Sequence, residues 1–256
     1  MIKNKVTSVP DGVDYLPGAY FGVGGTVATR FEEGFPIGYF HGYQTNGIFQ
    51  SQEEIDASPV VQEGAKPGDL IFVDQNGDVV ISFSDDSDKT MIGSAIPDFT
   101  MGLALNMRYK GFDLSTNIYA TYGQEIIRNF ERNQPYANQM AYMIDRWVGP
   151  GTSTTVPRVT TEATRNTVLS DFYVEDGSFI RLRNVQLGYT IPKKFTEKIK
   201  IESFRVYVSA NNLVTLTRYQ GFDPDIGPTA GTLSAGVDYG FYPQARTIMG
   251  GLIVKF

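Results

Sequence analysis

The feature that most constrains the fold is an alternation of apolar and other residues over segments of about ten positions. In the segment 99–109 every second residue is apolar, and these residues are Phe99, Met101, Leu103, Leu105, Met107 and Tyr109. Successive side chains of a β-strand point to opposite faces, so this period predicts a strand with one apolar face. The segment 112–122 repeats the period after Lys110-Gly111, which predicts a hairpin with a very short connection.

Three later segments, at 179–191, 203–217 and 246–256, continue the pattern. In the first of them the alternation slips near Arg183-Asn184, which predicts a β-bulge. The apolar face of each predicted strand carries no charged residue. Such a face is compatible with two folds, because it suits both the inner side of a soluble β-sandwich and the lipid-facing side of a transmembrane barrel.

The lengths of the connections favour the barrel. The connections at 110–111 and about 192–203 are short, whereas those at 123–178 and 218–245 are long. Short turns on one side and long loops on the other are typical of outer-membrane barrels, and a Greek-key sandwich has no reason to sort its loops in this way. We therefore predict an all-β fold in which residues 98–256 form antiparallel transmembrane barrel strands. Residues 1–97 are expected to be a long extracellular loop region with short strands.

Composition excludes several classes of function. The 256 residues include 22 Lys and Arg against 28 Asp and Glu, and the resulting net charge of −6 argues against a nucleic-acid partner. The chain has no Cys, which excludes disulfides and Cys-ligated metals, and no apolar run reaches the 18 residues of a transmembrane helix. The segment Met1–Lys5 lacks the apolar core of a signal peptide. The expectation is therefore either a cytosolic protein or a piece of a longer chain.

The best metal-ligand candidates are weak. Asp74, Asn76 and Asp78 occupy alternate positions, as in the first half of a calcium loop. Val79 stands where that loop needs Gly, and Asp85 stands where it needs Glu. An Asx-rich turn is the favoured interpretation, so we predict no metal ion and no cofactor.

The sequence offers no convincing catalytic group. His41 is the single histidine, and no Gly-x-Ser-x-Gly motif accompanies it. Asp223 and Asp225 form a carboxylate pair, but their Pro- and Gly-rich surroundings favour a loop-capping role over glycoside hydrolysis. We predict that the protein is not an enzyme.

Aromatic residues in the loops are candidates to stack on sugar rings or to contact a partner. Packing within the loops is an equal alternative. The residues are Tyr39, Phe40, Tyr43, Trp147, Tyr239, Phe241 and Tyr242.

Several segments, in order along the chain, resemble hallmark segments of the SusC/RagA-type TonB-dependent outer-membrane transporters. They are 35–50 (FPIGYFHGYQTNGIFQ), 67–69 (PGD), 73–78 (VDQNGD), 97–103 (PDFTMGL), 109–114 (YKGFDL), 174–184 (VEDGSFIRLRN), 205–213 (RVYVSANNL), 221–225 (GFDPD) and 238–243 (DYGFYP). The resemblance covers nearly the whole chain but only the C-terminal part of the family's sequence. It implies the last five or so strands of a large up-and-down barrel, with Phe256 as a signal for barrel assembly.

The resemblance also implies a function, a location and partners. The expected function is import of glycan or peptide fragments through the outer membrane, with a SusD-like surface lipoprotein. The remaining expected partners are the rest of the transporter chain including its plug, the TonB complex reached through the missing N-terminal part, and outer-membrane lipid. The alternative from another class is a soluble β-rich module that binds carbohydrate.

Overall fold

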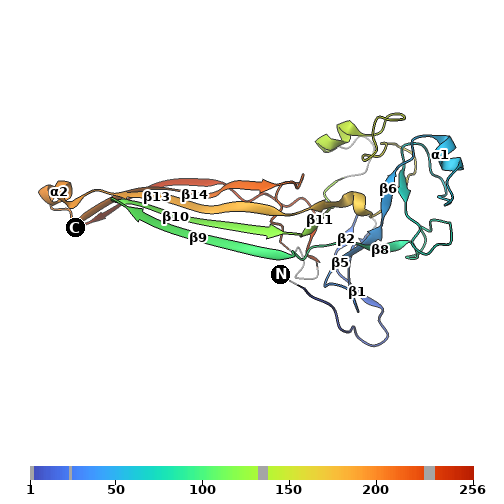
Figure 1. Cartoon of the computed structure of the whole chain (residues 1–256), viewed down its shortest axis with the longest axis horizontal. Helices are drawn as coiled ribbons and strands as arrows, with labels where there is room; N and C mark the ends of the chain where they lie inside the picture. Colours follow the sequence, from blue (N-terminus) through green and yellow to red (C-terminus); the bar gives the residue numbers. More distant parts are fainter. Residues whose placement is uncertain (1–2, 23–24, 132–137, 228–233) are drawn as a thin grey trace.

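Five long strands form the main sheet of the computed structural model, which describes residues 3–22, 25–131, 138–227 and 234–256. The strands are β9 (Phe99–Tyr109), β10 (Phe112–Tyr122), β13 (Phe179–Thr190), β14 (Ser203–Thr217) and β16 (Thr247–Lys255). Their order is β16-β14-β13-β10-β9, and each adjacent pair is antiparallel. Figure 1 shows a long blade with loops at one end and with the C-terminus and α2 (Lys193–Thr196) at the other. The predicted all-β fold with long antiparallel strands is confirmed.

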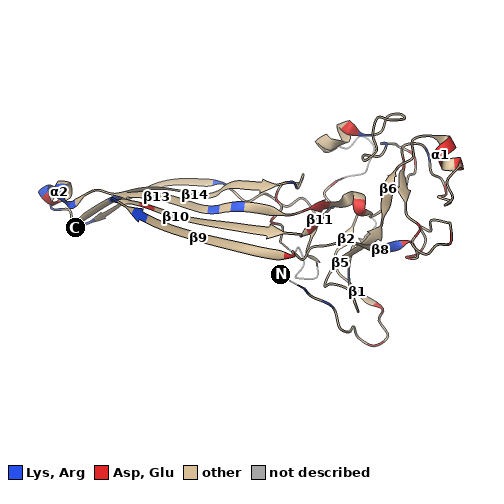
Figure 2. Cartoon of the chain, in the orientation of Figure 1, with Lys and Arg blue, Asp and Glu red and all other residues tan. Residues whose placement is uncertain are grey.

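The register places the apolar residues of all five strands on one face. Leu114 of β10 pairs with Met107 of β9 on one side and with Leu187 of β13 on the other. Leu187 in turn pairs with Val208 of β14. Large side chains on this face are exposed. The exposed fraction is 59% for Met101 and 66% for Leu252. By the strand register, this face contains no charged residue. Figure 2 shows that charged residues are few along the long strands.

A bulge in β13 keeps two arginines off this face. The pairing with β10 passes from Asn184 directly to Leu182 and leaves Arg183 as an extra residue. Without it, Arg181 and Arg183 would continue the alternation of Val185 and Leu187 and point to the apolar side, because side-chain direction has a period of two. The bulge predicted near Arg183-Asn184 is confirmed.

The opposite face carries the charged side chains. Arg205 of β14 reaches over β13 and donates from Nε to Oδ1 of Asp113 of β10 at 2.9 Å. The guanidinium passes directly over Gly188, where a Cβ atom would overlap it. The absence of a side chain at Gly188 therefore permits this ion pair across three strands.

Short strands form small sheets beside the loop end of the blade. Four pair in the order β1-β4-β5-β8, and they are β1 (Tyr15–Pro17), β4 (Thr29–Glu32), β5 (Tyr39–Tyr43) and β8 (Lys89–Ser94). Three pair in the order β12-β11-β15, and they are β11 (Glu125–Arg128), β12 (Val174–Asp176) and β15 (Val237–Asp238). Two further antiparallel pairs are β2 (Tyr20–Phe21) with β3 (Thr26–Val27), and β6 (Thr45–Ile48) with β7 (Leu70–Phe72).

Helices are few and short. α1 (Gln52–Asp56) begins after Ser51, whose hydroxyl accepts a hydrogen bond from the Glu54 backbone N–H. Single 3₁₀ turns occupy Ala141–Asp145, Asp171–Tyr173 and Glu197–Ile199. Among the described residues, no helix has both the length and the apolar composition needed to cross a membrane.

We call the described residues of 3–98, 123–178 and 218–246 the loop head. Two clusters of buried apolar side chains hold it together. One contains Ala19, Phe21, Ala28, Phe40, Ile127, Leu169, Tyr173 and Val237. The other contains Tyr43, Ile48, Leu70, Phe72 and Ile81. Each cluster joins segments that are far apart in the sequence, so the long loops are packed structures.

The substitution Gly188→Val is expected to lower the free energy of unfolding by about 1–3 kcal/mol, because the new side chain must displace the Arg205 guanidinium. Gly102→Val is the matched control, since no atom lies within 4 Å of its Cβ position and Val favours strands. Urea titration of the two variants measures the difference. Equal effects at the two positions would contradict the role assigned to Gly188.

Candidate functional site

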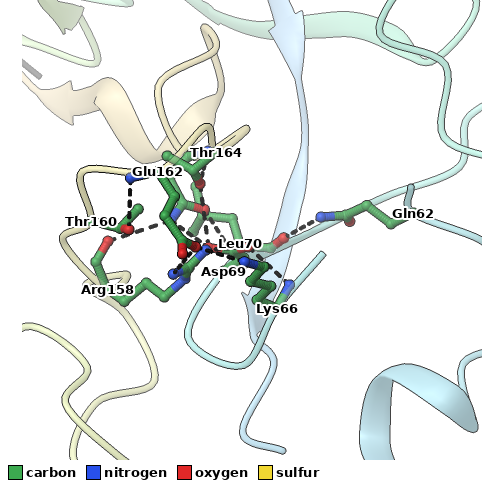
Figure 3. Close-up of polar contacts among 9 residues, drawn as sticks. Gln62, Lys66, Asp69, Leu70, Arg158, Thr160, Glu162 and Thr164 are labelled. Atoms are coloured by element: carbon green, nitrogen blue, oxygen red, sulfur yellow. Dashed lines mark hydrogen bonds and ion pairs between the residues drawn. The ribbon is translucent and has the colours of Figure 1, made fainter. Parts of the chain in front are cut away.

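The loop head contains two cavities and several buried ion pairs, so we take it as the candidate functional site. Its centre is Asp69, which is 3% exposed and lies just before β7. Arg158 Nε donates to Asp69 Oδ1 at 2.7 Å, and Asn166 Nδ2 donates to the same oxygen at 3.0 Å. The backbone N–H of Lys66 donates to Asp69 Oδ2 at 3.0 Å. Figure 3 shows how these contacts join the 62–70 segment to the 158–164 segment.

Further contacts reinforce this junction. The Arg158 N–H donates to the Gly68 carbonyl at 2.8 Å, and the Leu70 N–H donates to Asn166 Oδ1 at 2.9 Å. Gly68 has a φ of 90°, and the Trp147 ring lies so close that a Cβ atom would overlap it. The predicted loop aromatic Trp147 is therefore half-buried against this turn, where its indole N–H donates to Gln50 Oε1 at 3.2 Å.

A cavity of about 280 Å³ lies beside the junction. One wall is the segment 157–164, and the other is formed by Glu131, Gln139, Tyr142 and Met143. Asn166, Thr167, Phe172 and Tyr173 complete the lining. The cavity therefore combines aromatic rings, threonine hydroxyls and a few charged groups.

The charged groups of the cavity are already paired. Glu131 accepts from Arg128 Nη1 at 2.6 Å and from the Tyr142 hydroxyl at 2.5 Å. Glu162 pairs with Lys66 at 2.6 Å, and Arg158 pairs with Asp69. Burial and the bond to Glu131 raise the pKa of the Tyr142 hydroxyl and outweigh the opposing Arg128 charge. A neutral polar group, such as a sugar ring or a peptide bond, suits such a lining better than an ion does.

Three of the other candidate aromatics lie inside the loop head. Tyr39, Phe40 and Tyr43 are each at most 3% exposed, so their rings contact other parts of the chain. The Tyr39 hydroxyl donates to Glu32, and the Tyr43 hydroxyl donates to the Ser82 carbonyl at 2.9 Å.

The remaining three candidates are more accessible. Tyr239 is partly exposed, and its hydroxyl donates to the Tyr20 carbonyl at 2.7 Å. Phe241 is half-buried, whereas Tyr242 is 94% exposed. The structure thus separates the seven candidates and does not gather them around one pocket.

The Asp74 segment is an Asx-rich turn that uses its own side-chain oxygens. Asp74 accepts from the backbone N–H groups of Gly77 at 2.7 Å and Val79 at 2.9 Å. Asn76 Oδ1 accepts from the Asp78 N–H at 2.9 Å. No group of three or more His, Asp or Glu side chains within the described part of the chain is placed to hold a metal ion. Val79 has a φ of 64°, which is strained for a β-branched residue.

Asp223 and Asp225 cap a loop, as the sequence predicts. Asp223 accepts from the backbone N–H of Gln244 at 2.9 Å and from Arg181, while Asp225 accepts from Arg181 Nη1 at 3.1 Å. Burial opposes ionisation of Asp223, but these donors outweigh it and lower its pKa. The pair fastens the loop after β14 to the polar face of the sheet.

His41 lies in a second charged cluster, on β5. Its Nε2 is 3.5 Å from Arg30 Nη1 of β4, and Arg30 pairs with Asp86. Burial and the neighbouring Arg30 charge lower the pKa of His41 to about 4. Burial opposes ionisation of Asp86, but hydrogen bonds from Arg30 and Lys89 lower its pKa to about 2.

The chain is similar in sequence to several TonB-dependent receptors. It is 35% identical over 265 residues to TonB-dependent receptor P3 of Formosa agariphila, covering 99% of the chain and 26% of that receptor. It is 33% identical to TonB-dependent receptor P26 of the same organism and 27% identical, over 84% of the chain, to TonB-dependent receptor SusC of Bacteroides thetaiotaomicron. The chain corresponds to a section of a SusC/RagA-type TonB-dependent receptor. No family model matches the chain.

The receptor section spans about a quarter of the length of its first relatives, at 26% of TonB-dependent receptors P3 and P26. Two solved structures share its fold over 98% of the chain and 25% of the compared chain. They are the RagAB peptide importer in the open-open state, with 24% identity and a TM-score of 0.70, and the RagAB peptide transporter, with 23% and 0.71. The family predicted from the sequence is confirmed.

The Asp69–Arg158 junction of the receptor section could not be predicted from the sequence. The Pro67-Gly68-Asp69 motif drew attention to one partner, but Arg158 lies 89 residues further along the chain and has no local signal. Arg128 was missed for the same reason, because its ion pair with Glu175 joins segments 47 residues apart.

The substitution Asp69→Asn should lower the free energy of unfolding of the loop head by roughly 3 kcal/mol, because Arg158 loses its buried partner. Glu162→Gln is the matched control, since it also removes a carboxylate near Arg158 but one that is 59% exposed. Hydrogen exchange of residues 147–166 measures the effect. Equal protection in both variants would contradict the role of Asp69.

Acidification from pH 7 to pH 4 should cost roughly 3 kcal/mol of stability through His41 alone. The unfolded histidine binds a proton near pH 6.5 and the folded one only near pH 4, so the contribution is complete above pH 6.5 and is lost as the pH falls to 4. Urea titrations at several pH values should show a shallower decline for His41→Gln than for the parent. Identical declines would contradict the buried neutral state of His41.

Proposed function

We propose that this chain supplies the C-terminal barrel strands and loops of an outer-membrane receptor that imports glycan or peptide fragments. The observation that carries the proposal is the 35% identity to a TonB-dependent receptor over 99% of the chain. The RagAB structures, described as a peptide importer, and SusC support the same class. Import of this kind changes no covalent bond in the substrate, so the receptor is proposed to be a transporter and not an enzyme.

The main sheet has the dimensions that a lipid-facing role requires. Phe99 and Tyr122 stack at the loop end of the apolar face, with ring centroids 5.2 Å apart, and Phe112 and Tyr189 meet at the other end at 4.5 Å. Ten residue steps span about 33 Å along a strand. A strand tilted near 40° from the barrel axis then covers a height of about 25 Å, which is the height of the apolar band of an outer-membrane barrel. Aromatic rings at both edges suit the two membrane interfaces.

The alternative, a soluble carbohydrate-binding module, is not favoured. The apolar face is exposed along its whole length instead of packing against a second layer, and Leu103, Leu105 and Met107 are all exposed. A soluble monomer rarely leaves an apolar surface of this extent in water.

The proposed partners follow from the receptor class. The rest of the receptor chain, including its plug, would pair with the free edges of the sheet, and the TonB complex would supply energy through that part. A SusD-like surface lipoprotein would meet the loop head, which we place on the extracellular side. Phe256 is proposed to act in barrel assembly.

Within the loop head, we propose that the cavity between residues 139–143 and 157–167 contacts the imported fragment. Its paired charges and aromatic walls support a neutral polar ligand. The exposed Tyr242 and the partly exposed Tyr239 remain candidates for the substrate or for the lipoprotein. The buried Tyr39, Phe40 and Tyr43 are better explained as core residues.

A charge on the apolar face tests the proposal. Leu105→Arg should lower the stability of the inserted barrel by about 2–4 kcal/mol and remove the receptor from the outer-membrane fraction, together with TonB-dependent uptake of labelled glycans or peptides. Ala104→Arg is the control, because Ala104 pairs with Asn117 on the polar face and should assemble normally. Normal assembly and uptake of the Leu105→Arg receptor would show that the apolar face does not meet lipid.

A further inference from the structure

Charge is divided unequally along the long axis of the chain. We define the turn end as residues 108–113, 191–205 and 253–256, which lie opposite the loop head in Figure 1. The turn end contains eight Lys and Arg against three Asp and Glu, whereas the rest of the chain contains 14 against 25. The turn end is therefore basic although the chain as a whole is acidic.

Most of the acidic groups at the turn end are already engaged. Asp113 pairs with Arg205, and Glu202 lies 3.7 Å from Lys255. Five exposed lysines have no carboxylate within 4.0 Å in the described part of the chain, and they are Lys110, Lys193, Lys194, Lys198 and Lys200. In Figure 2 the ribbon around α2, at the tip of the blade, carries basic residues in blue beside an acidic one in red.

Two of these lysines lie along exposed aromatic rings. Lys110 Nζ is 5.1 Å from the ring centroid of Tyr109, which belongs to the apolar face and is 70% exposed. Lys194 Nζ is 4.8 Å from the exposed Phe195 ring. An aromatic ring at the hydrocarbon boundary with an ammonium group just beyond it is the arrangement expected where a side chain reaches into the headgroup layer.

We propose that the turn end binds anionic phospholipid headgroups in the membrane leaflet that surrounds the short turns. Five unpaired ammonium groups, placed immediately beyond an apolar face, complement the phosphate and net negative charge of lipids such as phosphatidylglycerol. The inference rests on the proposed function, because it requires the sheet to span a membrane. It adds a lipid preference that transport itself does not demand.

The test uses the full receptor that contains this section, reconstituted in phosphatidylcholine vesicles with spin-labelled phosphatidylglycerol or spin-labelled phosphatidylcholine. The motionally restricted fraction of each label measures lipid selectivity. The parent should favour the anionic label about threefold, and 0.5 M salt should remove most of this preference. A variant with all five lysines replaced by Gln should show no preference. The control replaces five other exposed cations by Gln (Lys3, Lys5, Arg146, Arg218 and Arg246) and should keep it.

Each outcome decides a different point. Equal selectivity for the two labels in the parent, or an unchanged preference in the Lys→Gln variant, overturns the lipid site while leaving the importer proposal intact. Selectivity lost equally in both variants also overturns it, because the effect would then follow net charge. Failure of the parent to insert into any vesicle overturns the membrane assignment and this inference with it. Since the salt response is measured on the parent receptor, the test does not depend on the folding of the variant.

Discussion

The rest of the structure depends on one constraint, which is that the side chains of the five long strands alternate in step, so that all the apolar ones lie on the same face of the sheet. A single residue of slip in any strand would turn its apolar side chains to the polar face and its polar ones to the apolar face. The long strand β13 contains such a slip at Arg183, and there it has the opposite effect. Because the sequence places Arg181 and Arg183 in line with Val185 and Leu187, the extra residue is what keeps the two guanidinium groups with the polar groups.

The same displacement organises the loop head. Arg181 bonds Asp223 and Asp225, and Arg183 lies over the Tyr119 ring at 3.8 Å while also bonding Asp225. The loop that follows β14 is thereby held against the sheet by charges that the bulge directs to that side. Together with the Asp69–Arg158 junction, these pairs give the long connections fixed positions, and a fixed binding surface loses less entropy when a ligand binds.

Features that depend on neighbouring residues could be predicted from the sequence, whereas features that depend on distant segments could not. The bulge at Arg183 depends on neighbouring residues, and it could be predicted from them. The fold class could be predicted because alternation and loop length are visible in one sequence. Burial of Phe40 and Tyr43 could not, since Phe40 packs in one cluster with Leu169 and Val237, and Tyr43 packs in another with Leu70 and Phe72. The partners of Asp69 were hidden for the same reason.

The two unpaired edges of the main sheet have a consequence for how the chain folds. Within the described residues β9 and β16 each have one neighbour, so a row of backbone N–H and C=O groups on each is left without a strand partner. Such edges promote aggregation, because another extended polypeptide can form backbone hydrogen bonds with them. An edge of this kind is a site of unwanted association unless another strand, a loop or another protein covers it. Early covering of the two edges therefore protects the chain in a way that the stability of the folded sheet alone does not.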